Sequence, residues 1–487
     1  MQSIKIIGIL FYFTLSQICF SQTLIWASFD KFSGSNAHCS AIGENNDGVF
    51  ILRYKDKNLR KNTYIDYYDH NLRLINTISI AERKKSVEKI LLLGQRLFVV
   101  YSDYSSFANQ LYYTEIEYQK KELGKIEFKP FVALEEPKSK RIDFDIIYDN
   151  LKNIAAINFL SETDNREAQM VWKTFNTDFD ADKSIVYNFE TELRNITILD
   201  KRLDEYGNIY VAYKKAIIKN IFSKDDSKIY LLTYNIKSKK WKNKLLNQDE
   251  FNINSIIIQE DNTNKIMHVA YFYSFKIING NYGLGQISIN TKSQEILSEH
   301  KEKISEEFSR GITGEKSGKE SELTSFIIQK LVPTKDSGCL IIAERFFVTN
   351  QSETIYQNGL PMTASRNVYN FEEVIVLSRD KNGLSRWNKT LLKRQNSIND
   401  GGYFSSAVVI PTPDKIHIIY NEKLLNNGDV VQWSIDRDGN FQQKNLFRYD
   451  MAVYMIIPSE SRAIGYNRAA IPLYLSGGNR ALLKIIY

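Results

Sequence analysis

The chain has 487 residues, of which 64 are Lys or Arg and 57 are Asp or Glu, so its formal charge at pH 7 is +7. Hydrophobic residues make up 43% and aromatic residues 13% of the chain, which is typical of a folded globular protein and excludes a disordered one. This small basic excess lacks the dense positive charge of nucleic-acid-binding domains, so we expect no nucleic-acid partner.

The first segment in chain order, residues 1–21, has the features of a cleaved secretory signal. Lys5 precedes an apolar stretch over residues 6–15, and a short polar region ends at Ser21. The stretch is shorter than the roughly 20 residues of a membrane-spanning helix, and no later segment reaches that length. We therefore expect an exported chain that is periplasmic, associated with the outer membrane or extracellular, and not transmembrane.

A turn of Asp, Asn or Gly followed by a short alternating strand recurs along the remaining chain, as in VFILRY after Asn46-Asp47-Gly48 and IYVAYK after Tyr206-Gly207-Asn208. Period-two alternation predicts strands, and repeated antiparallel units are typical of a β-propeller. Groups of four such runs cover residues 38–80, 89–134, 142–189, 197–246, 253–298, 323–392 and 403–447.

An eighth group, beginning at Met451, contains only three good strands, whereas residues 24–29 form a strand without a partner. Pairing of that N-terminal strand with the last group completes the eighth blade and leaves no open sheet edge. We predict an all-β fold, a β-propeller of eight four-stranded blades closed in this way, with seven blades as the alternative. Residues 22–487 then form a single propeller domain.

Two insertions interrupt the repeat. The stretch at about 305–322 is polar, charged and Gly-containing, which indicates a loop or a partly helical excursion. The stretch 349–371 lengthens the hairpin of the sixth group. Long loops on a rigid scaffold commonly carry binding sites, so these two stretches are the first places to look for function.

Cysteine usage gives no disulfide framework. Cys19 lies in the predicted signal; acylation there is the alternative to cleavage, but Ile18 stands where bacterial lipoprotein signals carry a small residue. Cys39 and Cys339 remain in the mature chain and lie beside or within apolar strand segments. An exported protein can oxidise such a pair, but we expect two buried free thiols.

Motifs for phosphate and calcium are incomplete. Residues 311–321 resemble a phosphate-binding loop in composition, but Lys316 stands where the second glycine belongs. Asp178, Asp180 and Asp182 alternate as calcium ligands do, yet the turn glycine and the closing acid of such a loop are missing. We interpret the first as a flexible insertion and the second as a solvated hairpin tip.

Zinc and hydrolase motifs are absent from the sequence. The five histidines are widely spaced, and there is no Cys-x-x-Cys, G-x-S-x-G or H-E-x-x-H pattern. We expect no metal and no cofactor. Propeller glycosidases and lyases collect acids, Tyr and Arg from several blades, so a channel site stays hidden from a motif search; Glu344 and Arg345 are candidates for it, with a structural ion pair as the alternative.

Residues 237–244, KSKKWKNK, group five lysines around Trp241. Such a segment can bind anionic glycans or lipid head groups. We favour the alternative, a cation-rich hairpin tip with the indole packed behind it, because charge runs usually mark solvated surface.

The segment 378–406 has the most specific sequence pattern in the chain. Its first half, with Trp387 after an Asp-Lys-Asn-Gly turn, resembles the Asp-box of propeller sialidases, S-x-D-x-G-x-x-W, but with a spacing two residues longer; the resemblance implies hairpin geometry only. Its second half concentrates polar residues at a turn between blades. There we select Arg394, Gln395 and Asp400 as binding residues, with mutual hydrogen bonds that lock adjacent blades as the alternative.

Over residues 323–422 the chain also resembles exported, functionally uncharacterised β-propeller-like proteins of Bacteroidota. The likeness rests on a D-S-G turn before L-I-A-E (336–344), an acidic-apolar strand (372–377), and W-x-K-x-x-x-K-R-Q followed by N-D-G-G-Y-F-S-S. The resemblance implies a secreted β protein of the cell envelope and no particular activity.

These observations favour a non-enzymatic binding or scaffolding module of the bacterial envelope, with a protein or glycan partner at its loop-bearing face. The alternative is a carbohydrate-active enzyme, a glycosidase or lyase, with a site at the channel mouth. Several carboxylates, Arg and Tyr converging there favour the enzyme; a channel lined by small or apolar side chains excludes it.

Overall fold

The computed structural model describes residues 22–28, 38–55, 59–103, 110–120, 127–133, 144–149, 154–176, 184–217, 226–247, 251–275, 280–313, 323, 325–357, 360–424, 428–447, 454–465, 467–475 and 480–487. The predicted signal, residues 1–21, and the Asp178-x-Asp180-x-Asp182 run lie outside the described residues.

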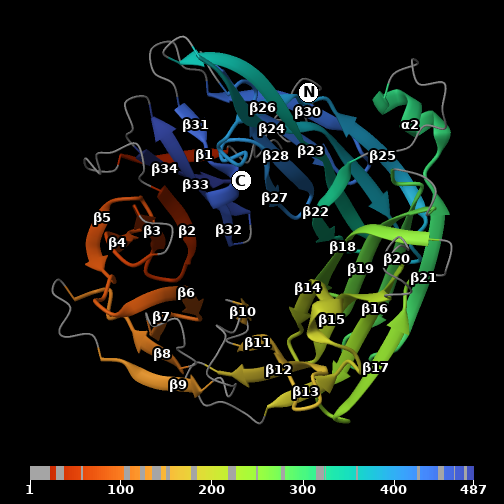
Figure 1. The fold of residues 1–487 in the computed structure, drawn as a ribbon. Helices are drawn as coiled ribbons and strands as arrows, with labels where there is room; N and C mark the ends of the chain where they lie inside the picture. Colours follow the sequence, from red (N-terminus) through yellow and green to blue (C-terminus); the bar gives the residue numbers. More distant parts are fainter. Residues whose placement is uncertain are drawn as a thin grey trace, which may run out of the picture.

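Eight antiparallel sheets form a ring (Figure 1). The first two contain β2 (His38–Glu44), β3 (Val49–Tyr54), β4 (Thr63–Tyr68) and β5 (Leu74–Ser79), then β6 (Lys85–Leu93), β7 (Arg96–Asp103), β8 (Gln110–Glu115) and β9 (Lys129–Ala133). The next two contain β10 (Phe144–Asp149), β11 (Ile154–Glu162), β12 (Ala168–Phe175) and β13 (Ile185–Asn188), then, after the short helix η1 (Leu193–Asn195), β14 (Ile196–Leu203), β15 (Ile209–Ile217), β16 (Asp226–Asn235) and β17 (Lys240–Leu245).

The second half of the ring repeats the pattern. The fifth sheet has β18 (Phe251–Asp261), β19 (Ile266–Phe275), β20 (Gly283–Asn290) and β21 (Ile296–Lys303); the sixth has β22 (Phe326–Pro333), β23 (Cys339–Gln357), β24 (Leu360–Arg379), β25 (Ser385–Leu391) and a short fifth strand, β26 (Gln395–Ile398). The seventh has β27 (Val408–Pro411), β28 (Lys415–Asn421), β29 (Val430–Asp436) and β30 (Phe441–Phe447). The prediction of eight antiparallel blades is confirmed.

The last sheet combines both ends of the described chain. It contains β31 (Tyr454–Ile456), β32 (Arg462–Gly465), β33 (Arg468–Leu475), β34 (Arg480–Ile486) and β1 (Thr23–Ser28). The helix η2 (Pro458–Glu460) divides β31 from β32, and both pair with β33. β1 pairs with β34 from Thr23 opposite Ile486 to Ser28 opposite Ala481, so the spare N-terminal strand lies where the sequence predicted it.

Aspartate turns join many of the strands. In four of them the first Asp accepts backbone N–H bonds at its Oδ1 from the residues two and four positions later: Asp69, Asp204, Asp380 and Asp436. The fourth residue of each turn has a positive φ, 58° at Leu72 and 81–87° at the glycines of the other three. The Asp side chain supplies the hydrogen bonds of each turn, and in the first turn Leu72 stands where the other three carry glycine.

The first strand of each sheet lies nearest the centre of the ring, and the fourth lies at the rim (Figure 1). Five of these central strands, β2, β6, β14, β18 and β22, contain a register shift. In four of them the side chain after the shift contacts the next sheet. Lys89 lies 3.9 Å from Asp145, and Lys330 donates to the carbonyl oxygen of Val409. Asp200 and Ser255 accept from the N–H groups of Ile258 and Ile328, respectively. A bulge turns a side chain out of the regular alternation, which is how one strand contacts its neighbour around the channel.

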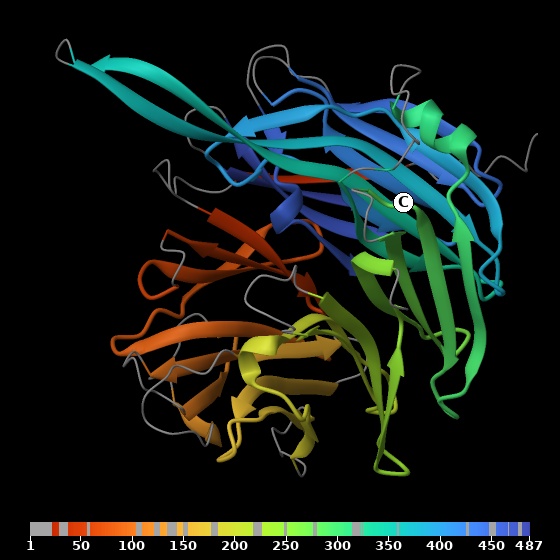
Figure 2. The same cartoon turned by 45° about the vertical axis from the view of Figure 1, so that its right-hand side comes forward.

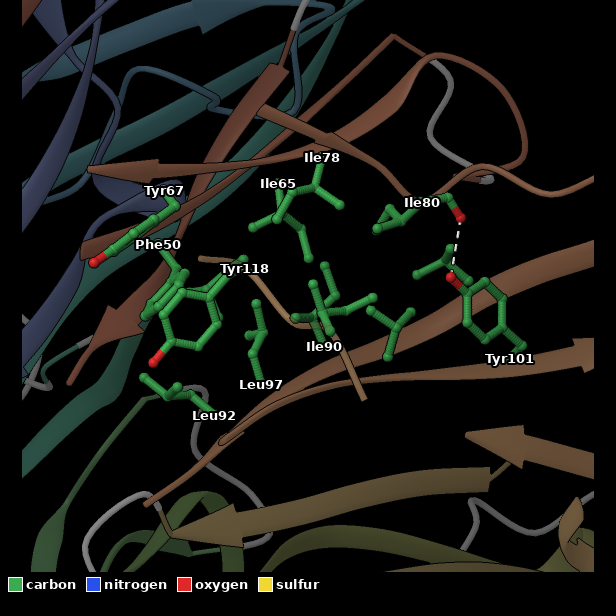
Figure 3. Close-up of a cluster of buried hydrophobic side chains, with 14 residues drawn as sticks. Phe50, Ile65, Tyr67, Ile78, Ile80, Ile90, Leu92, Leu97, Tyr101 and Tyr118 are labelled. Atoms are coloured by element: carbon green, nitrogen blue, oxygen red, sulfur yellow. Dashed lines mark hydrogen bonds between the residues drawn. The ribbon is translucent and has the colours of Figure 1, made fainter. Parts of the chain in front are cut away.

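The hydrophobic core lies between neighbouring sheets. Figure 3 shows the cluster between the first two, where Phe50 and Ile65 of one sheet pack with Leu97 of the other. The Tyr101 hydroxyl, also in this cluster, donates to the carbonyl oxygen of Ile80 at 3.1 Å, so this buried polar group is satisfied. Each sheet is therefore apolar on both faces, which explains the nearly continuous apolar runs of the second strands.

The first and last sheets share a cluster of the same kind. Cys39 and Val49 of the first sheet pack with Ala470 and Leu482 of the last. Among the described residues Cys39 and Cys339 are both buried and free, as predicted, and burial raises the pKa of each thiol to about 12. They are core residues rather than reactive thiols.

The insertion at 305–322 contains the helix α2 (Glu306–Thr313), in agreement with the predicted partly helical excursion; its remainder lies outside the described residues. In the part of the chain that is described, no helix is long and apolar enough to cross a membrane.

Candidate functional site

A two-stranded ribbon extends from the sixth sheet. β23 and β24 stay paired from Phe346 opposite Phe371 to Gln357 opposite Leu360, beyond the part where β22 and β25 flank them. The ribbon comprises residues 346–357 and 360–371. Only its base has a third strand, because β26 pairs with residues 368–371. Figure 2 shows the ribbon projecting from the body of the ring. The predicted long sixth hairpin is therefore a β-structure rather than an irregular loop.

Strand direction separates the two faces of the ring. The turns from first to second strands lie on one face, and the connections from second to third strands, together with the links between sheets, lie on the other. The ribbon and the link over residues 392–407 share this second face, which we call the ribbon face. The sequence-selected residues Arg394, Gln395 and Asp400 all lie in or beside that link.

A buried ionic network lies at the base of the ribbon. The Lys393 ammonium, whose side chain is fully buried, lies 2.6 Å from Glu344 Oε1 and donates to Gln395 Oε1 at 2.8 Å. The Ser406 hydroxyl donates to the other oxygen of Glu344 at 2.5 Å. Burial lowers the pKa of Lys393, and the Glu344 carboxylate opposes that shift. Both charges are therefore paired inside, and the network joins β23 at the base of the ribbon to the link.

Gln395 belongs to this network and not to the surface. Its side chain is buried; Nε2 donates to the carbonyl oxygen of Asn421 in the seventh sheet at 2.6 Å, and Oε1 accepts from the backbone N–H of Ser406 at 2.9 Å. Gln395 therefore locks adjacent blades by hydrogen bonds, which is the predicted alternative to a binding role.

Arg394 is the solvent-exposed member of the three. Its side chain is 82% exposed, and its Nε lies 3.8 Å from Glu372 Oε1. Arg345 lies 3.0 Å from the other oxygen of Glu372 and 3.6 Å from Glu373. Glu344 and Arg345, the candidates for a channel site or a structural ion pair, are both ion-paired. Glu344 pairs with Lys393, and Arg345 pairs with Glu372 and Glu373.

Asp400 shapes the link. Its Oδ1 accepts from the Ser397 hydroxyl at 2.5 Å and from the N–H of Gly402 at 2.8 Å. Gly402 has a φ of +77° and lies against Phe371, so close that a Cβ there would be 2.4 Å from the ring. The Asn367 N–H donates to Asn399 Oδ1, and the Asn399 N–H donates to the carbonyl oxygen of Asn367. These two hydrogen bonds fix the link against the ribbon.

Charged side chains of the central strands β6, β10 and β14 pair with one another. Asp145 lies 3.9 Å from Lys89 and 3.4 Å from Lys201, and Arg202 lies 3.0 Å from Asp200. Burial raises the pKa of Asp200, with Arg202 opposing the shift.

One arginine also links three of the sheets. Arg462 of the last sheet donates to the carbonyl oxygen of Ile42 at 2.8 Å and to the Tyr148 hydroxyl of the third sheet at 2.6 Å. These central strands therefore carry polar and charged side chains, and Asp145 and Asp200 each have a basic neighbour.

The remaining motifs have structural roles. Trp241 packs against Tyr187 and Tyr234 and donates from Nε1 to the carbonyl oxygen of Val186, as expected for an indole behind a basic hairpin. His268 and His417 are buried and contact Ser288 and Ser434. No group of three or more His, Cys, Asp or Glu suited to a metal ion occurs within the described ranges.

The sheet order and strand pairing define an eight-bladed β-propeller. No family model matches the chain, and no curated protein sequence matches it. Similar solved structures include the WD40 domain of SCAP from fission yeast (9% identity, 96% of this chain and 98% of that chain, TM-score 0.38) and Sqt1 from Chaetomium thermophilum (10%, 92% and 91%, 0.38). Another is the GH32 β-fructofuranosidase BmSUC1 from Bombyx mori (9%, 95% and 91%, 0.28). At these scores the similarities carry no inference about function.

Proposed function

We propose that this protein is an exported binding or scaffolding module of the bacterial cell envelope, and that it engages a protein or glycan partner through the ribbon face. The observation that carries the proposal is the ribbon itself. It is long, projects from a rigid ring, and is anchored at its base by the Lys393–Glu344 ion pair. A rigid scaffold with one projecting element presents a contact surface without a conformational change.

The ribbon is stiffened along its length by its own polar side chains. The Ser365 hydroxyl donates to Asn350 Oδ1 at 2.6 Å, and Arg366 forms an ion pair with Glu353 across the two strands. A two-stranded hairpin alone is marginally stable in water, and an edge strand offers unpaired backbone groups to a partner. These features support a protein partner that adds a strand to the ribbon.

The balanced charges of the channel support binding over catalysis. A glycosidase needs two carboxyl groups that are free to act on either side of the bond that it breaks. Asp145 is matched by Lys89 and Lys201, and Asp200 is matched by Arg202 and also accepts the N–H of Ile258, so these two carboxylates join neighbouring central strands.

The test is capture of partners from native membranes of the source bacterium. In the shortened variant, Asn-Gly replaces residues 352–365 and joins Gln351 to Arg366, which face each other, while the bonds between Asn367 and Asn399 are kept. We expect the natural protein to recover an envelope component in fixed ratio and the shortened variant to lose it. The double variant Lys240→Ala/Lys242→Ala, at the basic hairpin of another blade, is the matched control. Equal capture by the shortened variant contradicts the proposal.

A further inference from the structure

A second site lies on the face opposite the ribbon, between the sixth and seventh sheets. A pocket of about 620 Å³ opens there, within the range of about 300–1,000 Å³ that small-molecule sites occupy. Its floor is apolar and consists of buried side chains from both sheets, among them Leu340, Ile416 and Ile435.

Two contacts between the sheets bound this pocket. On one side Lys335 of the sixth sheet lies 3.7 Å from Asp414 of the seventh. On the other, the Trp387 indole donates from Nε1 to the carbonyl oxygen of Arg437 at 2.8 Å. Gly439 lies directly against the indole, since a Cβ there would be 2.8 Å from the ring. Trp387 is thus held in a fixed orientation as one wall of the pocket.

The rim carries charges that cancel. Four basic and four acidic side chains line the pocket: Lys335, Arg386, Lys415 and Arg437, with Asp336, Asp414, Asp436 and Asp438. Arg386 pairs with Asp336, and Arg437 pairs with Asp414 at 3.0 Å. The bonds from Arg386 and Thr334 outweigh the effect of burial and lower the pKa of Asp336 to about 2, so this acceptor stays ionised near neutral pH.

This combination selects a ligand class. A charged ligand gains no net attraction from a rim whose charges cancel, and an entirely apolar ligand would take water from the ion pairs without replacing its hydrogen bonds. A sugar offers an apolar C–H face for the indole and floor, and hydroxyl groups that donate to carboxylates and accept from guanidinium groups. We propose that this pocket binds an uncharged saccharide.

Calorimetric titration tests this with four neutral probes, cellotriose, maltotriose, laminaritriose and mannotriose, and one acidic probe, trigalacturonate. We expect at least one neutral trisaccharide to bind the natural protein more tightly than trigalacturonate does. Trp387→Ala and Asp336→Asn should each weaken that binding by about tenfold. Trp241→Ala, which removes an indole outside the pocket, should leave it unchanged.

The ribbon-shortened variant should bind the trisaccharide as the natural protein does, so failure of this proposal and failure of the proposed ribbon function are separable. Asp336→Asn retains the shape of the side chain and tests the site even if Trp387→Ala does not fold. Binding of trigalacturonate alone, no binding of any neutral probe, or full binding by Asp336→Asn and Trp387→Ala overturns the proposal.

Discussion

The Lys484 ammonium lies 2.6 Å from Glu44 Oε1, and both side chains are buried. Lys484 belongs to β34 in the last sheet and Glu44 to β2 in the first, so this ion pair joins residues 440 positions apart in sequence. Arg468 lies 3.1 Å from the second oxygen of Glu44, and His70 lies 2.8 Å from the first. The carboxylate therefore contacts two cationic side chains and an imidazole where the two ends of the ring meet.

Lys484→Met should destabilise the protein strongly, because it leaves the buried Glu44 carboxylate with fewer compensating charges. Breaking one side of a buried pair costs about 3–5 kcal/mol when the remaining charge is uncompensated, and Arg468 should keep the cost at or below the lower end of this range. Arg96→Met, which breaks a half-exposed pair with Glu115 inside one blade, should cost less than about 1 kcal/mol. Urea unfolding of both variants and of Glu44→Gln/Lys484→Met measures the difference; equal costs for the two single variants contradict a special role for the Glu44 pair.

Lys330 gives a pH-dependent prediction. Burial lowers its pKa from 10.5 to about 8. Between these values the unfolded chain binds a proton that the folded chain does not, so the stability of the natural protein should rise with pH across this window. Below pH 8 the cost of the buried charge is fully present. Relative to Lys330→Met, the natural protein should gain stability from pH 7 to pH 10 in urea titrations; a constant difference contradicts the assignment.

Two adjacent glycines in the link distinguish backbone strain from close packing. Gly401 and Gly402 have φ values of +71° and +77°, but only Gly402 has a neighbour, Phe371, in the way of a Cβ. Gly401→Ala should cost about 1–2 kcal/mol for the left-handed backbone. Gly402→Ala should cost about 1–3 kcal/mol more because the methyl group displaces the ring. Thermal unfolding compares them, and equal midpoints contradict the packing of the link on the ribbon.

Arg394 and Gln395 should behave differently although they are neighbours. Arg394→Ala removes an exposed side chain, so stability should change by less than about 0.5 kcal/mol while partner capture falls. Gln395→Leu leaves the carbonyl of Asn421 and the N–H of Ser406 without their partner, at a cost of about 1–3 kcal/mol each. Chemical unfolding and the membrane capture assay read the two effects separately.

Much of the fold follows from local sequence. Runs such as VFILRY alternate or are continuously apolar, and Asp turns bound them, so β3 and its hairpins are predictable from neighbouring residues. The spare strand at 24–29 and the short last group likewise predicted the pairing of β1 with β34. These features need only periodicity and turn chemistry.

The sites were less predictable because they depend on contacts between distant segments. The sequence around Gln395 does not indicate that its side-chain amide donates to the carbonyl oxygen of Asn421. The sequence around Trp387 does not indicate that its indole N–H donates to the carbonyl oxygen of Arg437. The sequence also predicts that the stretch 349–371 lengthens the sixth hairpin, but groups it with long loops. Continuous pairing of β23 with β24 makes this extension a two-stranded ribbon.

The most direct test of the central claim is hydrogen–deuterium exchange on the full chain, alone and with the component captured from membranes. The amides at the outer edges of the ribbon, within residues 349–354 and 361–367, should exchange rapidly in the free protein. We predict that they become protected in the complex while the turns of the opposite face do not change. Protection confined to the opposite face, or an intact complex with an unprotected ribbon, would contradict it.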